Sequence, residues 1–137
     1  MYKMAGAYEV TEVRQVYYTN GSKVNEDSFK NVGYMEFRYP QTGAINEDNG
    51  YFEVTNPNIT IIAFQELNNN YTFNWDTTWD DERLSLVWTD FLSTYGLTFT
   101  IAENKNKRKV LFFVYTETDQ DGNLNEVMEF YTLELIN

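Results

Sequence analysis

The chain of 137 residues contains no cysteine and no histidine. Their absence removes the residues of a Ser-His-Asp triad, of a Cys-His pair and of a histidine-bound zinc site, and it excludes disulfide bonds. The sequence also lacks a glycine-rich loop of the kind that cradles nucleotide phosphates. We therefore predict a protein that is not an enzyme and that uses no cofactor and no bound metal.

Basic residues are scarce. Ten Lys and Arg stand against 21 Asp and Glu, which gives a net charge of −11 at pH 7. A surface of that sign repels phosphate backbones, so we expect no nucleic-acid partner. One small basic cluster, residues 105–109, lies between two apolar runs. We interpret it as a solvated hairpin turn that also discourages strand pairing, rather than as an anion site.

Long apolar runs are missing as well. Runs such as Val110–Tyr115 are far shorter than the ~20 residues of a membrane-spanning helix, so we expect no transmembrane helix. The first residues, Met1–Met4, lack the apolar region of a signal peptide. This predicts either a cytoplasmic protein or one whose export signal has been trimmed. The oligomeric state is left open.

Turn signals are abundant and recur roughly every ten residues. Asn20-Gly21 and Asp121-Gly122 are examples, and between such signals lie alternating β-type runs such as Tyr71–Trp75 and Leu97–Ile101. We predict one domain, residues 1–137, built from about nine strands. The predicted strands are Ala7–Tyr18, Gly33–Tyr39, Gly50–Val54, Ile59–Glu66, Tyr71–Thr77, Arg83–Thr89, Leu97–Ala102, Lys109–Glu117 and Glu126–Ile136.

An antiparallel meander of this length must protect its edge strands, and closing the sheet on itself does so. We therefore predict an all-β fold, a single antiparallel up-and-down β-barrel, with a two-sheet β-sandwich as the alternative. Two polar stretches interrupt the predicted strands. Ser22–Lys30 is interpreted as a loop or a short helical turn, and Asp90–Tyr95 as another turn of helix.

Alternation of apolar and polar residues predicts which side chains point into the barrel. If the interior holds a ligand, these side chains line it. The predicted ligand-lining residues are Met35, Phe37, Phe73, Trp75, Leu86, Trp88, Phe99 and Phe112.

The first and last predicted strands break the alternation. Glu12 and Arg14 share a face with apolar residues in the first strand, and Glu129 does so in the last. We interpret both as β-bulges that flip the register midway. The alternative is a carboxylate inside the barrel, which would need Arg14 or Arg38 as its partner.

Two acidic segments are candidates for chemistry. Asp76–Glu82 carries four carboxylates beside Trp75 and Trp79, a mixture found in glycosidase clefts, but carboxylates on one turn rarely face each other across a sugar. Asp119–Glu126 has oxygen ligands at alternate positions, as calcium loops do, yet its Asp-Gly pair predicts a hairpin. We interpret both as solvated hairpins. Trp79, on a polar connection, would mark a binding surface if it is exposed.

Two short motifs resemble the lipocalin (calycin) family. Gly6-Ala7-Tyr8 is similar to the family's Gly-x-Trp start, with Tyr8 in place of Trp, and Thr89-Asp90-Phe91 with Tyr95 resembles its Thr-Asp-Tyr segment. The asparagine- and tyrosine-rich composition also resembles small lipocalin-like lipoproteins of Bacteroidetes. The resemblance implies a closed barrel with a cup for one small apolar ligand, and Ser22–Lys30 as the loop over its mouth. It also implies a periplasmic or cell-surface lipoprotein.

The leading functional prediction is non-catalytic binding of a small hydrophobic or amphipathic molecule inside the barrel. Two alternatives remain open. One is a surface interaction module, carbohydrate-binding for example, that uses Trp79 and neighbouring aromatic residues. The other is a structural accessory domain whose barrel is filled with its own side chains.

Overall fold

The structure is a computed structural model that describes residues 4–38, 49–64, 70–78, 80, 82–90 and 93–136. These residues form strands, turns and irregular segments. Across them, no helix has the length and apolar character that crossing a membrane requires.

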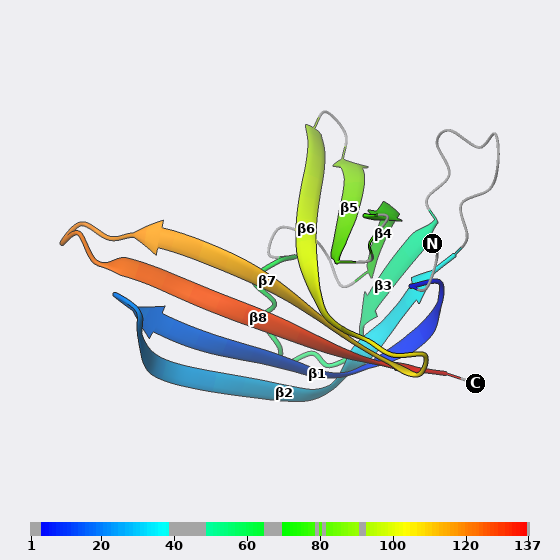
Figure 1. The fold of residues 1–137 in the computed structure, drawn as a ribbon, viewed down its shortest axis with the longest axis horizontal. Helices are drawn as coiled ribbons and strands as arrows, with labels where there is room; N and C mark the ends of the chain where they lie inside the picture. The colour runs from blue at the N-terminus through cyan, green and yellow to red at the C-terminus, as the bar shows by residue number, and fades with distance from the viewer. Residues whose placement is uncertain are drawn as a thin grey trace.

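Eight antiparallel strands follow one another around a closed barrel, and the last strand pairs with the first (Figure 1). The predicted up-and-down barrel is therefore confirmed, and the two-sheet sandwich is not the fold. The strands are β1 (Gly6–Thr19), β2 (Ser22–Phe37), β3 (Gly50–Val54), β4 (Asn70–Thr77), β5 (Arg83–Asp90), β6 (Ser93–Asn104), β7 (Arg108–Thr118) and β8 (Leu124–Leu135).

The polar stretch Ser22–Lys30 is part of β2 and not a loop over the barrel mouth. It pairs with β1 across a two-residue turn at Asn20 and Gly21, whose φ angles of 50° and 84° are those of a tight hairpin turn. The segment is polar because it lies at the edge of the sheet and both of its faces are largely exposed. Its polar composition therefore predicted a loop where the structure has a strand.

Two other predicted elements are wrong. Residues 59–64 of the predicted strand Ile59–Glu66 form no strand, and residues 65–66 lie outside the described residues. The predicted helical turn at Asp90–Tyr95 is instead the end of the β5–β6 hairpin, because Asp90, the last residue of β5, pairs with Ser93, the first residue of β6. Phe91 and Leu92 lie outside the described residues.

The strands differ in length, so the barrel is closed along only part of its height. β2 pairs with β3 only over Gly33–Phe37, and β6 pairs with β7 only where Thr100–Asn104 meets Lys109–Phe112. A Cβ on Gly33 would lie 1.9 Å from the Glu53 carbonyl oxygen, which explains a glycine at the β2–β3 seam.

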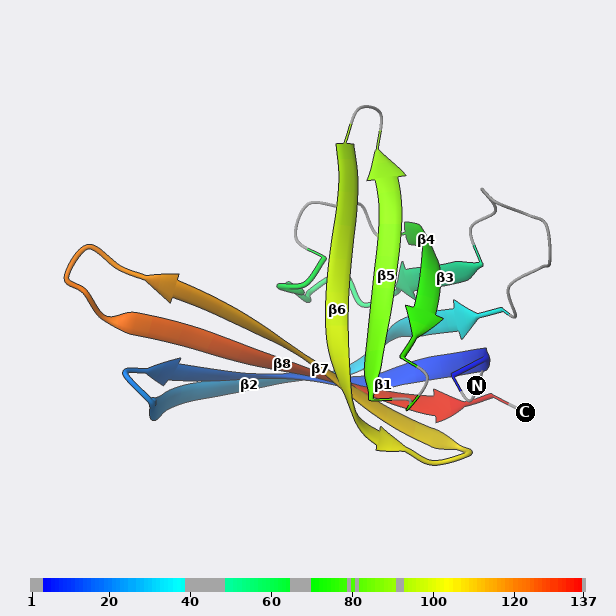
Figure 2. The ribbon, with the colours of Figure 1, turned by 45° about the horizontal axis from the view of Figure 1, so that its top comes forward.

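Beyond these seams four strands continue together as a sheet in the order β2-β1-β8-β7. We call this part the arm: β1 from Val13, β2 up to Lys30, β7 from Phe113 and β8 up to Glu129. In two views 45° apart the arm projects to one side, while β5 and β6 rise away from it (Figure 1, Figure 2).

The predicted bulge in the first strand is confirmed. The pairing of β1 with both neighbours shifts between Val10 and Glu12. Val10 is buried before the shift, and Val13 and Gln15 are buried after it. Glu12 and Arg14 thereby reach the outer surface.

The predicted bulge in the last strand is wrong. β8 pairs with β7 without a register shift from Leu124 to Glu134. Glu129 therefore keeps the same face as the buried Tyr131 and Leu133 and is itself 0% exposed. The alternative interpretation, a carboxylate inside the barrel, describes this strand.

Candidate functional site

Seven of the eight predicted lining residues point into the barrel. Met35, Phe37, Phe73, Trp75, Leu86 and Phe99 are buried there, and Trp88 is partly buried against them. Contact of any of them with a ligand stays a prediction.

The interior between β2 and β5 is occupied by the chain's own aromatic rings. The centroid of the Phe37 ring lies 5.5 Å from that of Trp75, in an edge-to-face contact, and 5.9 Å from that of Phe73. The indole N–H of Trp75 donates to the backbone carbonyls of Arg38, at 2.9 Å, and Asn49, at 3.1 Å. These residues form a packed layer in this part of the barrel.

Phe112 lies on the outer face and does not line the interior. It pairs with Phe130 across β7 and β8, with ring centroids 5.6 Å apart, and the Arg14 guanidinium lies 4.7 Å from the Phe130 ring. The run Val110–Tyr115 is apolar at every position, so alternation gave no indication of which residues face inward. Leu111 and Phe113 are the inward-facing residues.

The segment 59–64, which we call the inner segment, closes the interior on the arm side. Ile61, Ala63 and Phe64 are buried. The Phe64 ring lies 5.1 Å from that of Phe52 and 6.1 Å from that of Phe99. The inner segment thus supplies the apolar contacts that a strand was predicted to make, without joining the sheet.

A buried carboxylate holds the inner segment in place. Glu129 accepts four hydrogen bonds. One oxygen accepts the backbone N–H of Ile62 at 2.6 Å and the Gln15 side-chain amide at 2.7 Å. The other accepts the backbone N–H of Ala63 at 3.0 Å and the Tyr131 hydroxyl. Four donors compensate the desolvation of the charge, so neither Arg14 nor Arg38 is its partner.

Gln15 connects this network to the wall and to the inner segment. Its amide nitrogen also donates to the Thr60 carbonyl at 2.7 Å, and its oxygen accepts the Tyr17 hydroxyl at 2.9 Å. Burial raises the pKa of Tyr17, which keeps this hydroxyl a neutral donor. The sequence signal for the network was the break in alternation at Glu129. Its backbone partners could not be read from the sequence.

Arg14 and Arg38 instead form ion pairs on the outer surface. Arg14 lies 3.1 Å from Glu26, and Arg38 lies 3.2 Å from Glu36. The Arg38 guanidinium, through its hydrogen bond, lowers the pKa of the Glu36 carboxyl.

Half-buried apolar side chains gather where β6 diverges from β7. We call Trp88, Tyr95, Leu97 and Phe113 the mouth. Trp88 stacks on Tyr95 with centroids 5.7 Å apart and lies 6.2 Å from Phe64 of the inner segment. Phe113, on the opposite strand of the seam, lies 6.0 Å from the buried Phe99 ring below.

The indole nitrogen of Trp88 is the unusual atom of the mouth. Within the described residues it is buried and has no hydrogen-bond acceptor. An unsatisfied buried donor costs roughly 1–3 kcal/mol, and such groups need an explanation. An acceptor brought in by a ligand would remove that cost.

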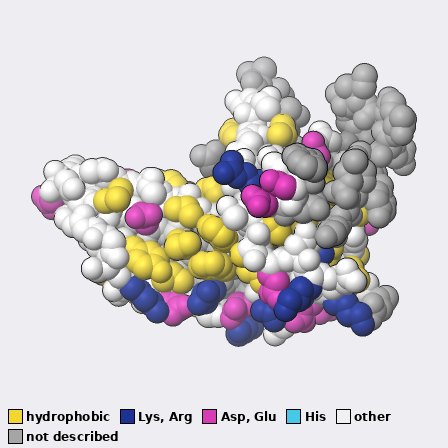
Figure 3. Space-filling view, viewed as in Figure 1, with side chains coloured by type: hydrophobic (Ala, Val, Ile, Leu, Met, Phe, Trp, Pro, Cys, Tyr) yellow, Lys and Arg dark blue, Asp and Glu magenta, His cyan; other side chains and the backbone are white. Residues whose placement is uncertain are grey.

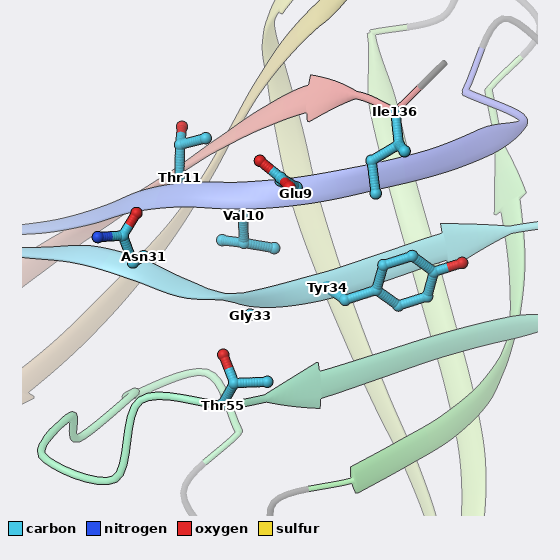
Figure 4. A pocket seen from close by; sticks show the side chains of 8 residues that line it. All are labelled: Glu9, Val10, Thr11, Asn31, Gly33, Tyr34, Thr55 and Ile136. Atoms are coloured by element: carbon cyan, nitrogen blue, oxygen red, sulfur yellow. The ribbon is translucent and has the colours of Figure 1, made fainter.

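A separate hollow of about 270 Å³ lies on the outside of the barrel at the β1 bulge. Figure 4 shows its side chains along β1 and β2 and just past the ends of β3 and β8. The lining residues are Glu9, Val10, Thr11, Asn31, Gly33, Tyr34, Thr55 and Ile136. Glu9 is the carboxylate among the lining residues. The Tyr34 hydroxyl donates to Glu36 at 3.0 Å and not to Glu9, so a general acid–base pair is not assembled there.

The described residues of the first acidic segment lie at the end of β4 and between β4 and β5, and the second segment forms a turn. Asp80 accepts hydrogen bonds from the Thr78 hydroxyl and the Glu82 amide, which lower its pKa, while Trp79 and Asp81 lie outside the described residues. Asp119 accepts the backbone amides of Asp121 and Asn123, at 3.0 and 2.9 Å, as a hairpin cap. The hairpin predicted for Asp119–Glu126 is confirmed. The described residues contain no group of three acidic side chains placed to hold a metal.

The basic cluster forms a β6–β7 turn, as predicted, with one exception. Lys105 and Arg108 are exposed and lie 2.9 and 3.1 Å from Glu103. Lys109 is buried and its ammonium group donates to the Asn104 side chain, so it is not part of the solvated turn.

Comparison with known proteins adds no relative to this description. No protein-family model, no curated protein and no solved structure matches the chain.

Proposed function

We propose that the protein binds a small amphipathic molecule, without catalysis, at the mouth between β5–β6 and β7. The observation that carries this proposal is the buried Trp88 N–H without an acceptor, set among half-buried apolar side chains. The site lies nearer the surface than the cup predicted from the sequence, because aromatic side chains and Phe64 occupy the interior below it.

The chemistry of the mouth favours a ligand with an apolar body and one oxygen acceptor. Trp88, Tyr95, Leu97 and Phe113 offer ring and alkyl surface, which binds apolar groups through burial and stacking. The Trp88 N–H can donate one hydrogen bond to a hydroxyl, carbonyl or carboxylate oxygen. Apolar walls with a few placed polar groups are the usual composition of small-molecule sites.

The experiment measures binding of anilinonaphthalene sulfonate and its displacement by dodecanoate. Native mass spectrometry of the purified protein is run in parallel to find any molecule retained from the cell. In Trp88→Phe the ring surface is largely kept and the donor is lost, so we expect affinity to fall by about fivefold to tenfold, the worth of one hydrogen bond. Trp88→Ala should bind still more weakly.

The matched control is Tyr18→Phe, which removes a polar group from a half-buried ring on the arm, away from the mouth. Its affinity should equal that of the unchanged protein. Equal affinity of Trp88→Ala would overturn the proposal. If neither probe binds the unchanged protein and no molecule is retained, the filled-barrel alternative replaces it.

A further inference from the structure

Among the described residues, the outer edge of β7 in the arm has no neighbouring strand. β6 leaves β7 after Phe112, so residues 113–118 pair with β8 on one side only. Within the described residues, no backbone hydrogen bond reaches this stretch from the other side. An unpaired edge of this kind presents a row of amides and carbonyls that can accept another strand.

This edge carries less protection than the opposite edge. β2, the other edge of the arm, carries Lys23, Glu26, Asp27 and Lys30 within residues 22–30. The stretch 110–116 of β7 contains no charged residue, no proline and no glycine. Charges and prolines are the usual means by which proteins prevent strand addition. Residues 22–30 of β2 carry four charges, whereas residues 113–118 of β7 carry one, Glu117 near the hairpin tip, and this difference marks β7 as the edge more open to a partner.

Apolar side chains flank this edge on both faces of the arm. Val114 is 41% exposed on the outer face and Tyr115 is 45% exposed on the inner face. On the outer face Phe112, Phe130 and Met128 continue the apolar surface toward β8, and Figure 3 shows hydrophobic side chains gathered along the arm. A strand added at β7 would therefore gain side-chain contacts as well as backbone hydrogen bonds.

The charge near the edge identifies the kind of partner. β7 runs toward a hairpin tip that carries Glu117, Asp119, Asp121 and Glu126, and residues 110–137 contain no Lys or Arg. A second copy of this chain would add another −11 of net charge beside that tip. A basic segment would be attracted to it.

We propose that residues 113–118 of β7 bind an extended segment of a partner protein that alternates apolar residues and carries Lys or Arg at one end. The segment adds to the arm antiparallel to β7, as most strand pairs do. Because β7 runs toward the acidic tip, the basic residues lie at the amino-terminal end of the bound segment. This edge shares only Phe113 with the mouth, and the proposal does not depend on the ligand.

The test uses three fluorescent peptides and the full chain, with binding measured by anisotropy. The first is Lys-Lys-Val-Thr-Val-Thr-Val-Thr, the second carries the two lysines at the carboxyl end, and the third has glutamates in their place. We expect binding in the order first, second, third, and weaker binding as the salt concentration rises. Absence of binding by the first peptide, or equal binding of all three, overturns the proposal.

Edge variants locate the binding. Val114→Lys places a cation on the edge and should weaken binding of the first peptide about tenfold or more. Val24→Lys is the matched control, because Val24 is an exposed valine on the β2 edge, and it should leave binding unchanged. Thr116→Lys is a second edge variant that alters no buried side chain. Far-UV circular dichroism verifies the fold of each variant.

Two results would assign the edge differently. Equal weakening by Val24→Lys and Val114→Lys would show that the effect is one of general charge, which overturns the proposal. The unchanged protein could instead sediment as a dimer, and Val114→Lys could dissociate that dimer. This result would show that the partner at the edge is a second copy of the chain.

Discussion

At the scale of single residues, Glu129 connects the inner segment to the barrel wall. It is the carboxylate that the sequence marks by a break in alternation, and all four of its hydrogen-bond donors come from distant parts of the chain or from the strand face beside it. Such a group stabilises the fold only while every donor has its acceptor.

Glu129→Gln should lower the free energy of unfolding by about 2–4 kcal/mol. A glutamine presents one acceptor oxygen and one NH₂ group, so two of the present donors would face another donor. Urea denaturation measures the loss, and hydrogen exchange should show lost protection at the Ile62 and Ala63 amides. Glu134→Gln, exposed on the same strand, should change stability by less than about 0.5 kcal/mol. Equal stability of the two variants contradicts the role given to Glu129.

Glu12, on the outer surface, makes a contribution to the free energy of unfolding that depends on pH. Its carboxylate accepts hydrogen bonds from Lys30 and from Ser28, which lower its pKa from 4.5. A carboxyl whose pKa is lowered in the folded state adds stability above its unfolded pKa. That stability is lost as the pH falls through the folded pKa.

Glu12→Gln should therefore cost less than about 1 kcal/mol at pH 7, because the pair is partly solvated, and nothing once the pH has fallen well below the folded pKa. Urea unfolding of both proteins across this range measures the difference. The control is Glu9→Gln, on the same strand, whose carboxylate forms no ion pair with a described residue. A cost that stays constant with pH would show that Glu12 acts through packing and not through its charge.

At the scale of elements, the inner segment is an irregular stretch where a strand was expected, and the buried Phe64 ring anchors it in the barrel. Phe64→Ala should lower stability by about 3–5 kcal/mol, because it removes a ring that contacts Phe52 and Phe99 and leaves a cavity. Chemical denaturation measures the loss. Thr60→Ala, an exposed residue of the same segment, should cost far less. A cost below about 1 kcal/mol for Phe64→Ala would mean that the segment is not part of the folded core.

Three segments differ from their sequence-based predictions, each for a physical reason. Val110–Tyr115 is apolar at every position, so alternation does not identify the inward face, and Phe112, predicted to face inward, faces outward. Ser22–Lys30 is polar because it is an exposed edge, and polarity indicated a loop. Ile59–Glu66 is apolar because residues 59–64 pack inside the barrel. A buried segment that forms no strand pairing has the same apolar composition as a buried strand, so composition does not distinguish the two.

At the scale of the whole molecule, unequal strand lengths divide the barrel into two parts. The closed part, where β2 pairs with β3 and β6 pairs with β7, holds the packed aromatic layer. The arm and the β5–β6 hairpin extend beyond it and leave two exposed features, the mouth and the β7 edge. Both functional proposals arise from this division, because a fully closed barrel would cover both features.

The sequence by itself determined the all-β class, the antiparallel order of the strands, the bulge in β1 and the turns at Asn20-Gly21 and Asp121-Gly122. These depend on local backbone preference and on alternation, which act between near neighbours in the chain. Only the tertiary structure decided that Glu129 is satisfied by the amides of residues 62 and 63, that Phe64 occupies the interior and that β6 leaves β7 after Phe112. These contacts join residues far apart in sequence, and no local pattern specifies their partners.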